Sequence, residues 1–357
     1  MRLRPEIAAL AAYSQGRSAS PDGFKLSSNE NPYPALPGVL DAAARHVDIN
    51  RYPDGAAIAL RTRLAERFGV DVGEVIVGAG SSSLLQQFFL AAASHGDEIV
   101  YAWRSFEAYP GFVTVTGASS VQVPLTDALE HDLDGLAGAV TDRTRAVVVC
   151  SPNNPTGPAV AATAFEAFMA QVPSDVLVIL DEAYREFVTD PSAVDGEDYI
   201  GRYPNLVITR TFSKAYGLAG LRVGYAIGPA PLLAAARATA IPFAVTEIGF
   251  AAAITSLEDE HQKQLDERVA EIVRRRDRLR GLLIERGWSI PGAQGNFLWL
   301  PTGDATPAAT EAFFDADIAV RPFGSEGIRI TIGEEESLER ILDVVASVDS
   351  GFDNHSH

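Results

Sequence analysis

The sequence is poor in the residues that build disulfide frameworks and thiolate metal sites. Among its 357 residues, Cys150 is the only cysteine. An intramolecular disulfide and a zinc site made of cysteines are therefore both excluded. This composition fits a reducing compartment, so we expect a cytoplasmic protein and no bound metal.

Long apolar runs and an excess of positive charge are also missing. Arg237 and Pro242 interrupt the best candidate for the roughly 18 consecutive apolar residues that a membrane helix needs. The apolar stretch at residues 7–12 is too short for an export signal. With 29 basic against 47 acidic residues, the formal charge of −18 repels polyanions. We therefore expect neither a membrane span nor a nucleic-acid partner.

What is present is the composition of an ordinary globular protein. Hydrophobic residues make up 47% of the chain and charged residues 21%, so a large core can form. A length of 357 residues exceeds that of a usual single domain. The sequence therefore predicts either two domains or one large α/β body with an appendage.

Short runs rich in Val and Ile alternate with amphipathic segments between residues 74 and 240. The expected strands are residues 74–77, 98–102, 121–125, 145–150, 176–180, 206–209 and 223–227. The clearest helix patterns cover 82–94, 162–170 and 231–240. This alternation predicts an α/β fold, with a mainly parallel seven-stranded sheet sandwiched by helices.

The pattern changes after about residue 245. A long charged helix is expected over 257–287, then short strands at 296–300, 318–320 and 327–332, with helices near 308–316 and 335–348. These elements are typical of a smaller α+β domain. We expect an N-terminal arm at 1–35 joining this small domain, a large domain at 36–245 and the small domain at 246–357.

Several polar motifs follow predicted strands, where open α/β sheets bind ligands. Gly78-Ala79-Gly80-Ser81 stands between a strand and a helix, and suits a phosphate bound at the helix N-terminus. Ser83 replaces the third glycine of a dinucleotide fingerprint. Taken alone, a tight turn with a serine cap is about as good an explanation.

Asn154 and Asp181 follow two further strands. Pro155 holds Asn154 extended and allows a rigid, even cis, turn that could aim the amide at a ligand, although an ordinary turn is the better explanation of this segment taken alone. A buried carboxylate such as Asp181 is costly unless paired, so we expect a cation beside it. Because the chain lacks a phosphate-binding lysine loop, a magnesium role for Asp181 is the weaker alternative.

Lys214 and two arginines complete the set. Lys214 follows a buried strand, where desolvation would lower its pKa and make the amine a nucleophile, although a solvated surface lysine is the commoner case for this residue taken alone. Arg222, with Ser81 and Ser213, could complete a dianion pocket. Arg329 lies in an apolar strand pattern, where its planar fork suits a substrate carboxylate, or else a structural salt bridge.

One group matches all of these features. Pyridoxal 5'-phosphate carries a phosphate, a pyridinium nitrogen, an aldehyde and a phenolic oxygen, and an amino acid substrate adds a carboxylate. The motifs that carry a family resemblance are Ser28-Asn29-Glu30-Asn31-Pro32, Arg51-Tyr52-Pro53, Asn153-Asn154-Pro155-Thr156-Gly157, Asp181-Glu182-Ala183-Tyr184, Ser213 to Arg222 and Arg329. In this order they resemble the histidinol-phosphate and aromatic amino acid branch of the class II, fold-type I pyridoxal-phosphate aminotransferases.

The resemblance implies a role for each matching residue. Lys214 would hold the cofactor and shuttle the proton, Asp181 would pair with the pyridinium nitrogen, and Asn154 and Tyr184 would contact the phenolic oxygen. Phe106 would stack on the ring. The phosphate contacts implied are Gly80, Ser81, Ser213, Arg222 and, from the second subunit of a homodimer, Tyr52. Arg329 would bind the α-carboxylate, or the phosphate of histidinol phosphate.

The resemblance also implies a substrate class. Ser82-Ser83 and the segment at residues 103–110 are similar to the aromatic subgroup. We therefore expect transfer between phenylalanine, tyrosine or tryptophan and 2-oxoglutarate, with histidinol phosphate as the alternative. A pyridoxal-phosphate decarboxylase and an NAD-dependent dehydrogenase are more distant alternatives. Expected substrate contacts are Arg329, Asn154, Tyr13 and Asn29; Phe106, Tyr109 and Phe243 are further candidates for pocket walls, or equally for core positions.

Overall fold

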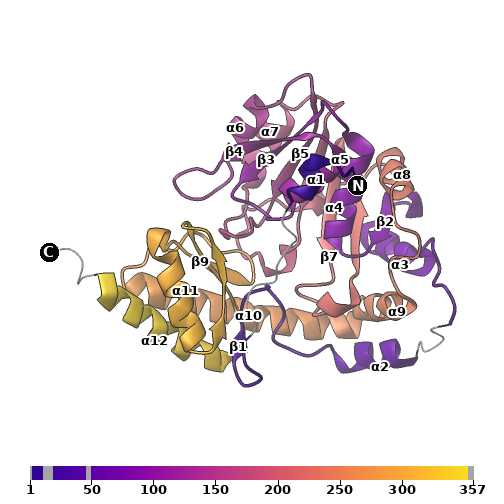
Figure 1. Cartoon of the computed structure of the whole chain (residues 1–357). Helices are drawn as coiled ribbons and strands as arrows, with labels where there is room; N and C mark the ends of the chain where they lie inside the picture. The colour runs from indigo at the N-terminus through magenta and orange to yellow at the C-terminus, as the bar shows by residue number, and fades with distance from the viewer. Residues whose placement is uncertain (1, 11–18, 46–49, 353–357) are drawn as a thin grey trace.

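A seven-stranded sheet forms the centre of the protein (Figure 1), whose structure is a computed structural model that describes residues 2–10, 19–45 and 50–352. The strands are β2 (Val75–Gly78), β3 (Glu98–Trp103), β4 (Ser119–Pro124), β5 (Thr144–Cys150), β6 (Leu177–Asp181), β7 (Leu206–Thr211) and β8 (Gly224–Ile227). Their order is β2-β8-β7-β6-β5-β3-β4, and only β8 runs antiparallel to its neighbours. This confirms the predicted α/β fold and its seven strands.

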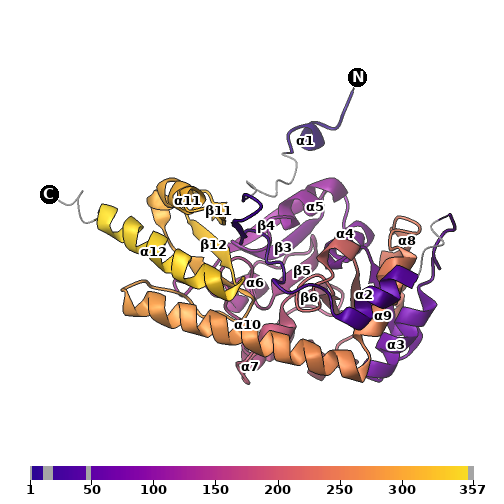
Figure 2. The ribbon, with the colours of Figure 1, turned by 90° about the horizontal axis from the view of Figure 1, so that it is seen from below.

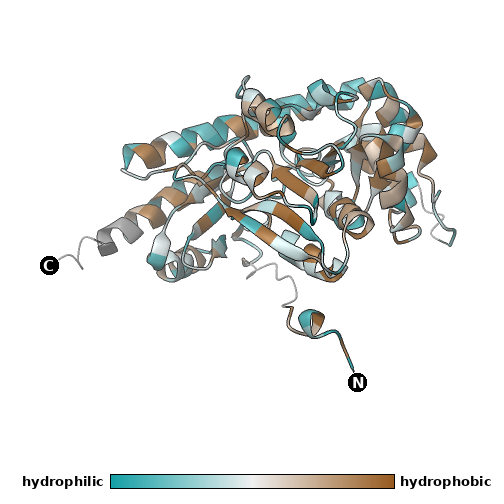
Figure 3. Ribbon diagram, turned by 90° about the horizontal axis from the view of Figure 1, so that it is seen from above, coloured by the Kyte–Doolittle hydropathy of each residue, from teal (hydrophilic) through white to brown (hydrophobic). Residues whose placement is uncertain are grey.

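Helices bury both faces of this sheet, as its continuous apolar strands require. In β5, Ala146 and Val148 pack with α4 (Ser81–Ala92), α5 (Tyr109–Thr116) and α8 (Ala230–Ala238). Val147 and Val149 point to the opposite face and pack with α6 (Leu133–Gly138) and α7 (Ala162–Met169). Figure 3 shows the apolar strands enclosed by helices with polar outer surfaces.

Beyond the large sheet, β9 (Phe297–Leu300), β11 (Arg321–Phe323) and β12 (Gly327–Thr331) form an antiparallel sheet in the order β11-β12-β9. Helices α11 (Thr306–Asp315) and α12 (Glu335–Phe352) accompany it. The long helix α10 (Asp259–Glu285) extends from the large body to this smaller one (Figure 2). Strand β11 was not predicted, because three residues are too few to show an alternating pattern.

The N-terminal arm connects the parts of the molecule. Strand β1 (Phe24–Lys25) pairs in parallel with β10 (Ile318–Ala319), so this part of the chain contacts the smaller body. Helix α2 (Pro37–Arg45) then packs on α9 (Glu247–Ser256), beside α3 (Ile58–Phe68). The short α1 (Pro5–Ala8) lies near α5. The domain boundaries at residues 35 and 245 stay predictions.

The described residues contain no candidate for a membrane-spanning helix or for a metal-binding cluster. No helix in this part of the chain is long and apolar enough to cross a membrane. In the same residues, no group of three or more His, Cys, Asp or Glu side chains is arranged to hold a metal ion.

Candidate active site

The predicted polar motifs meet at one edge of the large sheet. Parallel strands place their carboxyl ends together, and the register sets Cys150 of β5, Asp181 of β6 and Thr209 of β7 side by side. The segments that follow β2, β3, β5, β6 and β7 therefore bring Gly80, Phe106, Asn154, Tyr184 and Lys214 to the same edge. This shared edge is the candidate active site.

An anion site lies where β2 meets α4. Gly80 has φ +78° and directly precedes α4, whose first-turn N–H groups have no acceptors inside the helix. The Arg222 guanidinium packs over this turn and donates to the Ser213 hydroxyl at 3.2 Å. Helix N–H groups, a hydroxyl and a guanidinium form a seat for a phosphate dianion.

The edge also holds a buried carboxylate. Asp181 is 3% exposed, and it accepts hydrogen bonds from the Tyr109 hydroxyl at 2.7 Å and from Thr209 at 3.1 Å. Burial raises its pKa, and these two hydrogen bonds act in the opposite direction. Among the described residues, no Lys or Arg forms an ion pair with Asp181. The cation expected beside Asp181 is therefore not a side chain of the described residues; the expectation stays a prediction, which a cationic ligand atom would satisfy.

Tyr109 has a role that the sequence did not reveal. It was a candidate substrate wall or core residue, and it is fully buried, with Phe106 packed edge-on against it at 5.5 Å between ring centroids. Its hydroxyl is the closest contact of Asp181. Tyr109 therefore connects Phe106 with the Asp181 carboxylate. This connection results from the packing of α5 against the strand ends, which the sequence does not reveal.

Lys214 presents an amine at the same edge. Its Nζ donates to the Ser28 carbonyl at 3.0 Å and lies 5.8 Å from the centre of the Tyr184 ring. Desolvation, together with the positive charges of Arg329 and Arg222, lowers the pKa of Lys214 to about 7. Above that pH the amine is neutral and able to act as a nucleophile or base.

Tyr184 is held by the N-terminal arm. The Asn29 amide donates to the Tyr184 hydroxyl at 2.9 Å, and the Asn29 backbone N–H donates to Thr331 of β12. Burial raises the pKa of the Tyr184 phenol, so it remains protonated. We expected Asn29 to contact the substrate. Among the described residues, its amide contacts Tyr184 and orients that ring.

Arg329 connects three parts of the chain. From β12 it donates to the Asn154 side-chain oxygen and to the Ser27 carbonyl, both at 2.6 Å. Its guanidinium carbon lies 5.7 Å from the Phe323 ring centre and 5.8 Å from that of Phe297. A buried arginine that faces Asn154, with apolar rings around it, suits a bidentate carboxylate. The Asn154–Pro155 peptide is cis.

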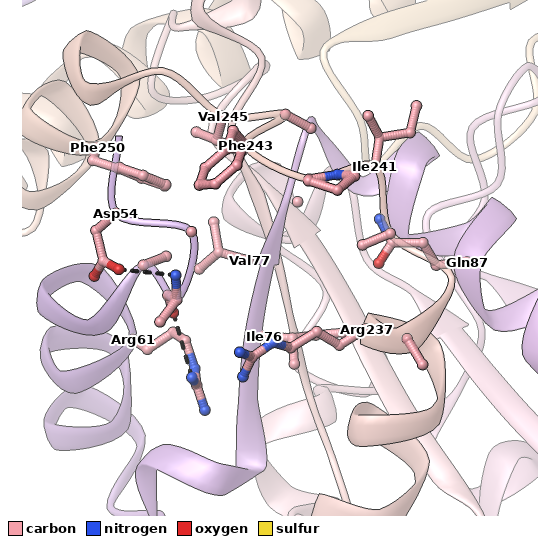
Figure 4. A pocket seen from close by; sticks show the side chains of 18 residues that line it. Asp54, Arg61, Ile76, Val77, Gln87, Arg237, Ile241, Phe243, Val245 and Phe250 are labelled. Carbon is pink, nitrogen blue, oxygen red and sulfur yellow. Dashed lines mark hydrogen bonds between the residues drawn. The ribbon is translucent and has the colours of Figure 1, made fainter. Parts of the chain in front are cut away.

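Tyr52 and Tyr13, predicted to contact the cofactor phosphate and the substrate, are not among the contacts described above. Tyr52 is 82% exposed and stacks on Phe243, with ring centroids 4.7 Å apart. Phe243 lines a separate pocket next to the Gly78 turn, together with Asp54, Arg237 and Phe250 (Figure 4). The expected contact of Tyr52 with a phosphate would have to come from a second subunit. Tyr13 lies outside the described residues.

Two supporting residues were not singled out individually from the sequence. These are Thr209, which donates to Asp181, and Asn31, whose amide donates to the Ala215 carbonyl at 2.8 Å next to Lys214. The Ser28 to Pro32 motif already contained Asn31. Thr209 carried no signal, because the alternation of a strand does not show which neighbour its polar side chain meets.

Three features of this chain fit pyridoxal phosphate. They are a seat for its phosphate, a buried carboxylate that could pair with its cationic ring nitrogen, and an amine of lowered pKa for its aldehyde. The fold and site are those of a fold-type I pyridoxal-phosphate enzyme. The chain belongs to the family described as aminotransferase class I and II, whose model matches residues 21–345. It is a pyridoxal-phosphate-dependent aminotransferase, and this membership decides against the dehydrogenase and decarboxylase alternatives.

Individual relatives agree with this family. The chain is 49% identical over 347 residues to an aromatic amino acid aminotransferase of Streptomyces coelicolor, covering 96% of each chain. A protein of the same name in Thermobifida fusca is 49% identical, again covering 96% of each. A histidinol-phosphate aminotransferase of Sinorhizobium meliloti, solved in complex with pyridoxal-5'-phosphate, superposes with a TM-score of 0.87 at 28% identity, covering 97% of this chain and 98% of that one.

Proposed function

We propose that the chain is an aromatic amino acid aminotransferase, which transfers the amino group between phenylalanine, tyrosine or tryptophan and 2-oxoglutarate. Relatives of that name, 49% identical over 96% of both chains, support the substrate class. The observation that carries the chemistry is the environment of Asp181: among the described residues, this buried carboxylate accepts hydrogen bonds from neutral donors, at a strand edge shared with Lys214.

Each residue then has a defined task. The bound cofactor supplies an electron sink for the carbon that loses its proton. Asp181 keeps a proton on the ring nitrogen by opposite charge, and Tyr109 and Thr209 hold the carboxylate in place. Lys214 Nζ removes the Cα proton of the substrate and would deliver a proton to the cofactor carbon that keeps the amino group, since its lowered pKa suits both steps near neutral pH.

The remaining residues bind and orient. Arg329 binds the substrate α-carboxylate, and Asn154 and Tyr184 orient the ring through its phenolic oxygen. Gly80, Ser81, Ser213 and Arg222 hold the phosphate. Phe106 stacks on the face of the cofactor ring, and the edge-on contact with Tyr109 holds the Phe106 side chain in place.

The surroundings of the active site suggest how the protein is assembled. Phe243 lines the pocket of Figure 4, and the exposed Tyr52 stacks on Phe243; we expect this face to be covered by a second subunit of a homodimer that contributes Tyr52. The single cysteine supports a cytoplasmic location.

The decisive experiment compares two pairs of substrates, each made up of an amino donor and an amino acceptor. Purified protein with pyridoxal phosphate is assayed with phenylpyruvate plus glutamate, and with histidinol phosphate plus 2-oxoglutarate. We expect kcat/KM for the aromatic substrate to exceed that for histidinol phosphate. Higher efficiency with the phosphorylated amine would replace this proposal by histidinol-phosphate transfer, which several structural neighbours carry in their names.

A further inference from the structure

A buried polar cluster lies at the carboxyl ends of β3, β4 and β5, and its members have no role in the function proposed above. Its centre is Asn153, which is 1% exposed. The Asn153 side-chain oxygen accepts from the Ser105 hydroxyl at 2.7 Å and lies 3.1 Å from His131 Nε2. The amide nitrogen donates to the Arg104 carbonyl at 3.0 Å and to the Thr156 hydroxyl at 2.8 Å. One side chain therefore contacts four protein groups.

The chemistry of the neighbours fixes the direction of these hydrogen bonds. A backbone carbonyl only accepts, so the amide nitrogen of Asn153 must face Arg104 and the amide oxygen must face His131. His131 therefore carries a proton on Nε2. Burial lowers the pKa of His131 to about 4, so the imidazole is neutral near pH 7. Its Nδ1 is buried without a hydrogen-bond partner among the described residues, where a second N–H would have no acceptor.

Asn153 connects three loops that follow neighbouring strands. The loop after β3 supplies Ser105, the loop after β4 supplies His131, and Asn153 itself lies in the loop after β5. Thr156, which accepts from Asn153, donates in turn to the Leu129 carbonyl at 2.9 Å in the loop after β4. These strands are adjacent in the order β5-β3-β4. The cluster therefore fixes the three loops relative to one another.

Two of these loops carry residues that we assign to the cofactor. Phe106 directly follows Ser105, and Asn154 directly follows Asn153. The Asn154 side-chain oxygen accepts from Arg329 at 2.6 Å, so its amide nitrogen is the side that can donate to the phenolic oxygen of the cofactor. The stacking ring and this donor thus belong to different loops, and the Asn153 contacts hold the two loops together.

We propose that Asn153 is a positioning residue, which places the cofactor ring by joining the loop of Phe106 to the loop of Asn154. This inference rests on the roles proposed above for those two residues. Asn153 acts through them, because its own side chain is engaged by four protein groups. A displacement of about 1 Å in a group that orients a reactant can lower a rate about 100-fold, so a rigid connection between the loops matters for the reaction.

The first test follows the absorbance of the bound cofactor as a function of pH. A donor to the phenolic oxygen favours the ionised form of that oxygen, so displacement of Asn154 should raise the pH midpoint of the absorbance change. We expect Asn153→Ala to raise this midpoint by about half a pH unit or more. The dissociation constant of pyridoxal phosphate should rise about tenfold in the same variant.

Asn154→Ala separates failure of this inference from failure of the assigned contact. It removes the donor completely, so its midpoint should rise at least as far as that of Asn153→Ala. A rise in Asn154→Ala with no change in Asn153→Ala would overturn the positioning role alone. An unchanged midpoint in Asn154→Ala would refute the contact with the phenolic oxygen, and the inference would fall with it.

Asn205 provides a matched control at the opposite edge of the same sheet. It is also buried, and its amide donates to the Val176 carbonyl at 2.7 Å and to the Pro173 carbonyl at 3.3 Å, just before β6 and β7 begin. Asn205→Ala should lower the thermal midpoint of unfolding and leave the absorbance midpoint and the cofactor affinity unchanged. The same changes in both alanine variants would show that lost stability explains them, and would overturn the inference.

His131 allows a milder test with a conservative rescue. His131→Leu removes one donor to the Asn153 oxygen, whereas His131→Gln offers an amide N–H near the position of Nε2. We expect His131→Leu to raise the absorbance midpoint in the direction of Asn153→Ala, and His131→Gln to stay close to wild type. Equal midpoints in the two His131 variants would contradict the role of this hydrogen bond in positioning Asn153.

Hydrogen exchange measures the connection between the loops in the apoprotein, without the cofactor. Asn153→Ala should speed amide exchange both in residues 103–109 and in residues 153–157, because the loops lose their common contact. Asn205→Ala should speed exchange in neither segment. Faster exchange in residues 153–157 alone would show that the two loops are independent, and would overturn the inference.

Discussion

At the scale of single residues, the chemistry of the candidate site depends on how burial shifts the pKa values of two titratable groups. Asp181 is enclosed by Tyr109 and Thr209, and burial raises its pKa. Lys214 loses hydration beside two arginines, which lowers its pKa to about 7. The pKa of the carboxyl group is raised and that of the amine is lowered, at the same edge of the sheet. Such a pair of shifted pKa values is the acid–base arrangement that proton transfer at a substrate carbon requires.

Removing the amine should abolish the reaction. We expect Lys214→Ala to lower transfer by about 10⁴-fold or more, since a covalent and proton-transferring group is lost. The sequence contains two other lysines, and the exposed Lys263 provides the control, because Lys263→Ala should retain full activity. Amino transfer from phenylalanine, followed as phenylpyruvate formation, distinguishes the two variants. Comparable turnover in both would remove Lys214 from the site.

The pH dependence of cofactor uptake follows from the same group. A lysine is nucleophilic only when neutral, and a pKa of about 7, rather than the ordinary 10.5, makes Lys214 neutral above pH 7. The rate at which apoprotein incorporates pyridoxal phosphate should therefore rise through pH 7 and level off above it. Stopped-flow absorbance from pH 5.5 to 10 measures this rate. A continued rise up to pH 10 would show that the amine has an ordinary pKa.

At the scale of elements, the phosphate seat depends on how β2 turns into α4. Gly80 has φ +78° and ψ 163°, a region that is accessible essentially to glycine alone. A Cβ at this position would lie 2.4 Å from Arg222 Nη2. The backbone turn and the position of the guanidinium are therefore determined together by the absence of a side chain.

Gly80→Ala should weaken cofactor binding because it displaces Arg222 as well as straining the turn. We expect the dissociation constant of pyridoxal phosphate to rise about tenfold or more, equivalent to the loss of one charge-assisted hydrogen bond. Gly96→Ala is the matched control, since Gly96 has φ +94° but open space around its Cα. Both variants should lower the thermal midpoint, and only Gly80→Ala should change the affinity, measured by fluorescence titration. Equal affinities would argue against the seat.

At the scale of the whole molecule, three distant parts of the chain supply one site. The arm contributes the Ser27 and Ser28 carbonyls, the smaller sheet contributes Arg329, and the large sheet contributes Asn154 and Lys214. Pairing of β1 with β10 fixes the arm against the smaller body. We therefore expect the geometry of the amine and of the carboxylate-binding arginine to depend on the same arm.

The expected second subunit can be tested by mixing two inactive variants. If Tyr52 acts across a homodimer, subunits with Lys214→Ala and subunits with Tyr52→Ala should form hybrids that contain one intact site. Random exchange of equal amounts should restore about a quarter of wild-type activity. Each variant subjected alone to the same mixing protocol is the control. Activity that stays at the level of the parents would place Tyr52 in the site of its own subunit or outside any site.

The sequence by itself determined the strands and the polar residues that follow them, because period-2 apolar patterns and strand-terminal motifs are local properties. Thus Gly80, Asn154, Asp181 and Lys214 could be named from spacing alone. Only the tertiary structure decided which side chains meet. The contact of Tyr109 with Asp181 and that of Glu107 with Arg321 span 72 and 214 positions. Such contacts depend on strand order and on helix packing, which no local pattern encodes.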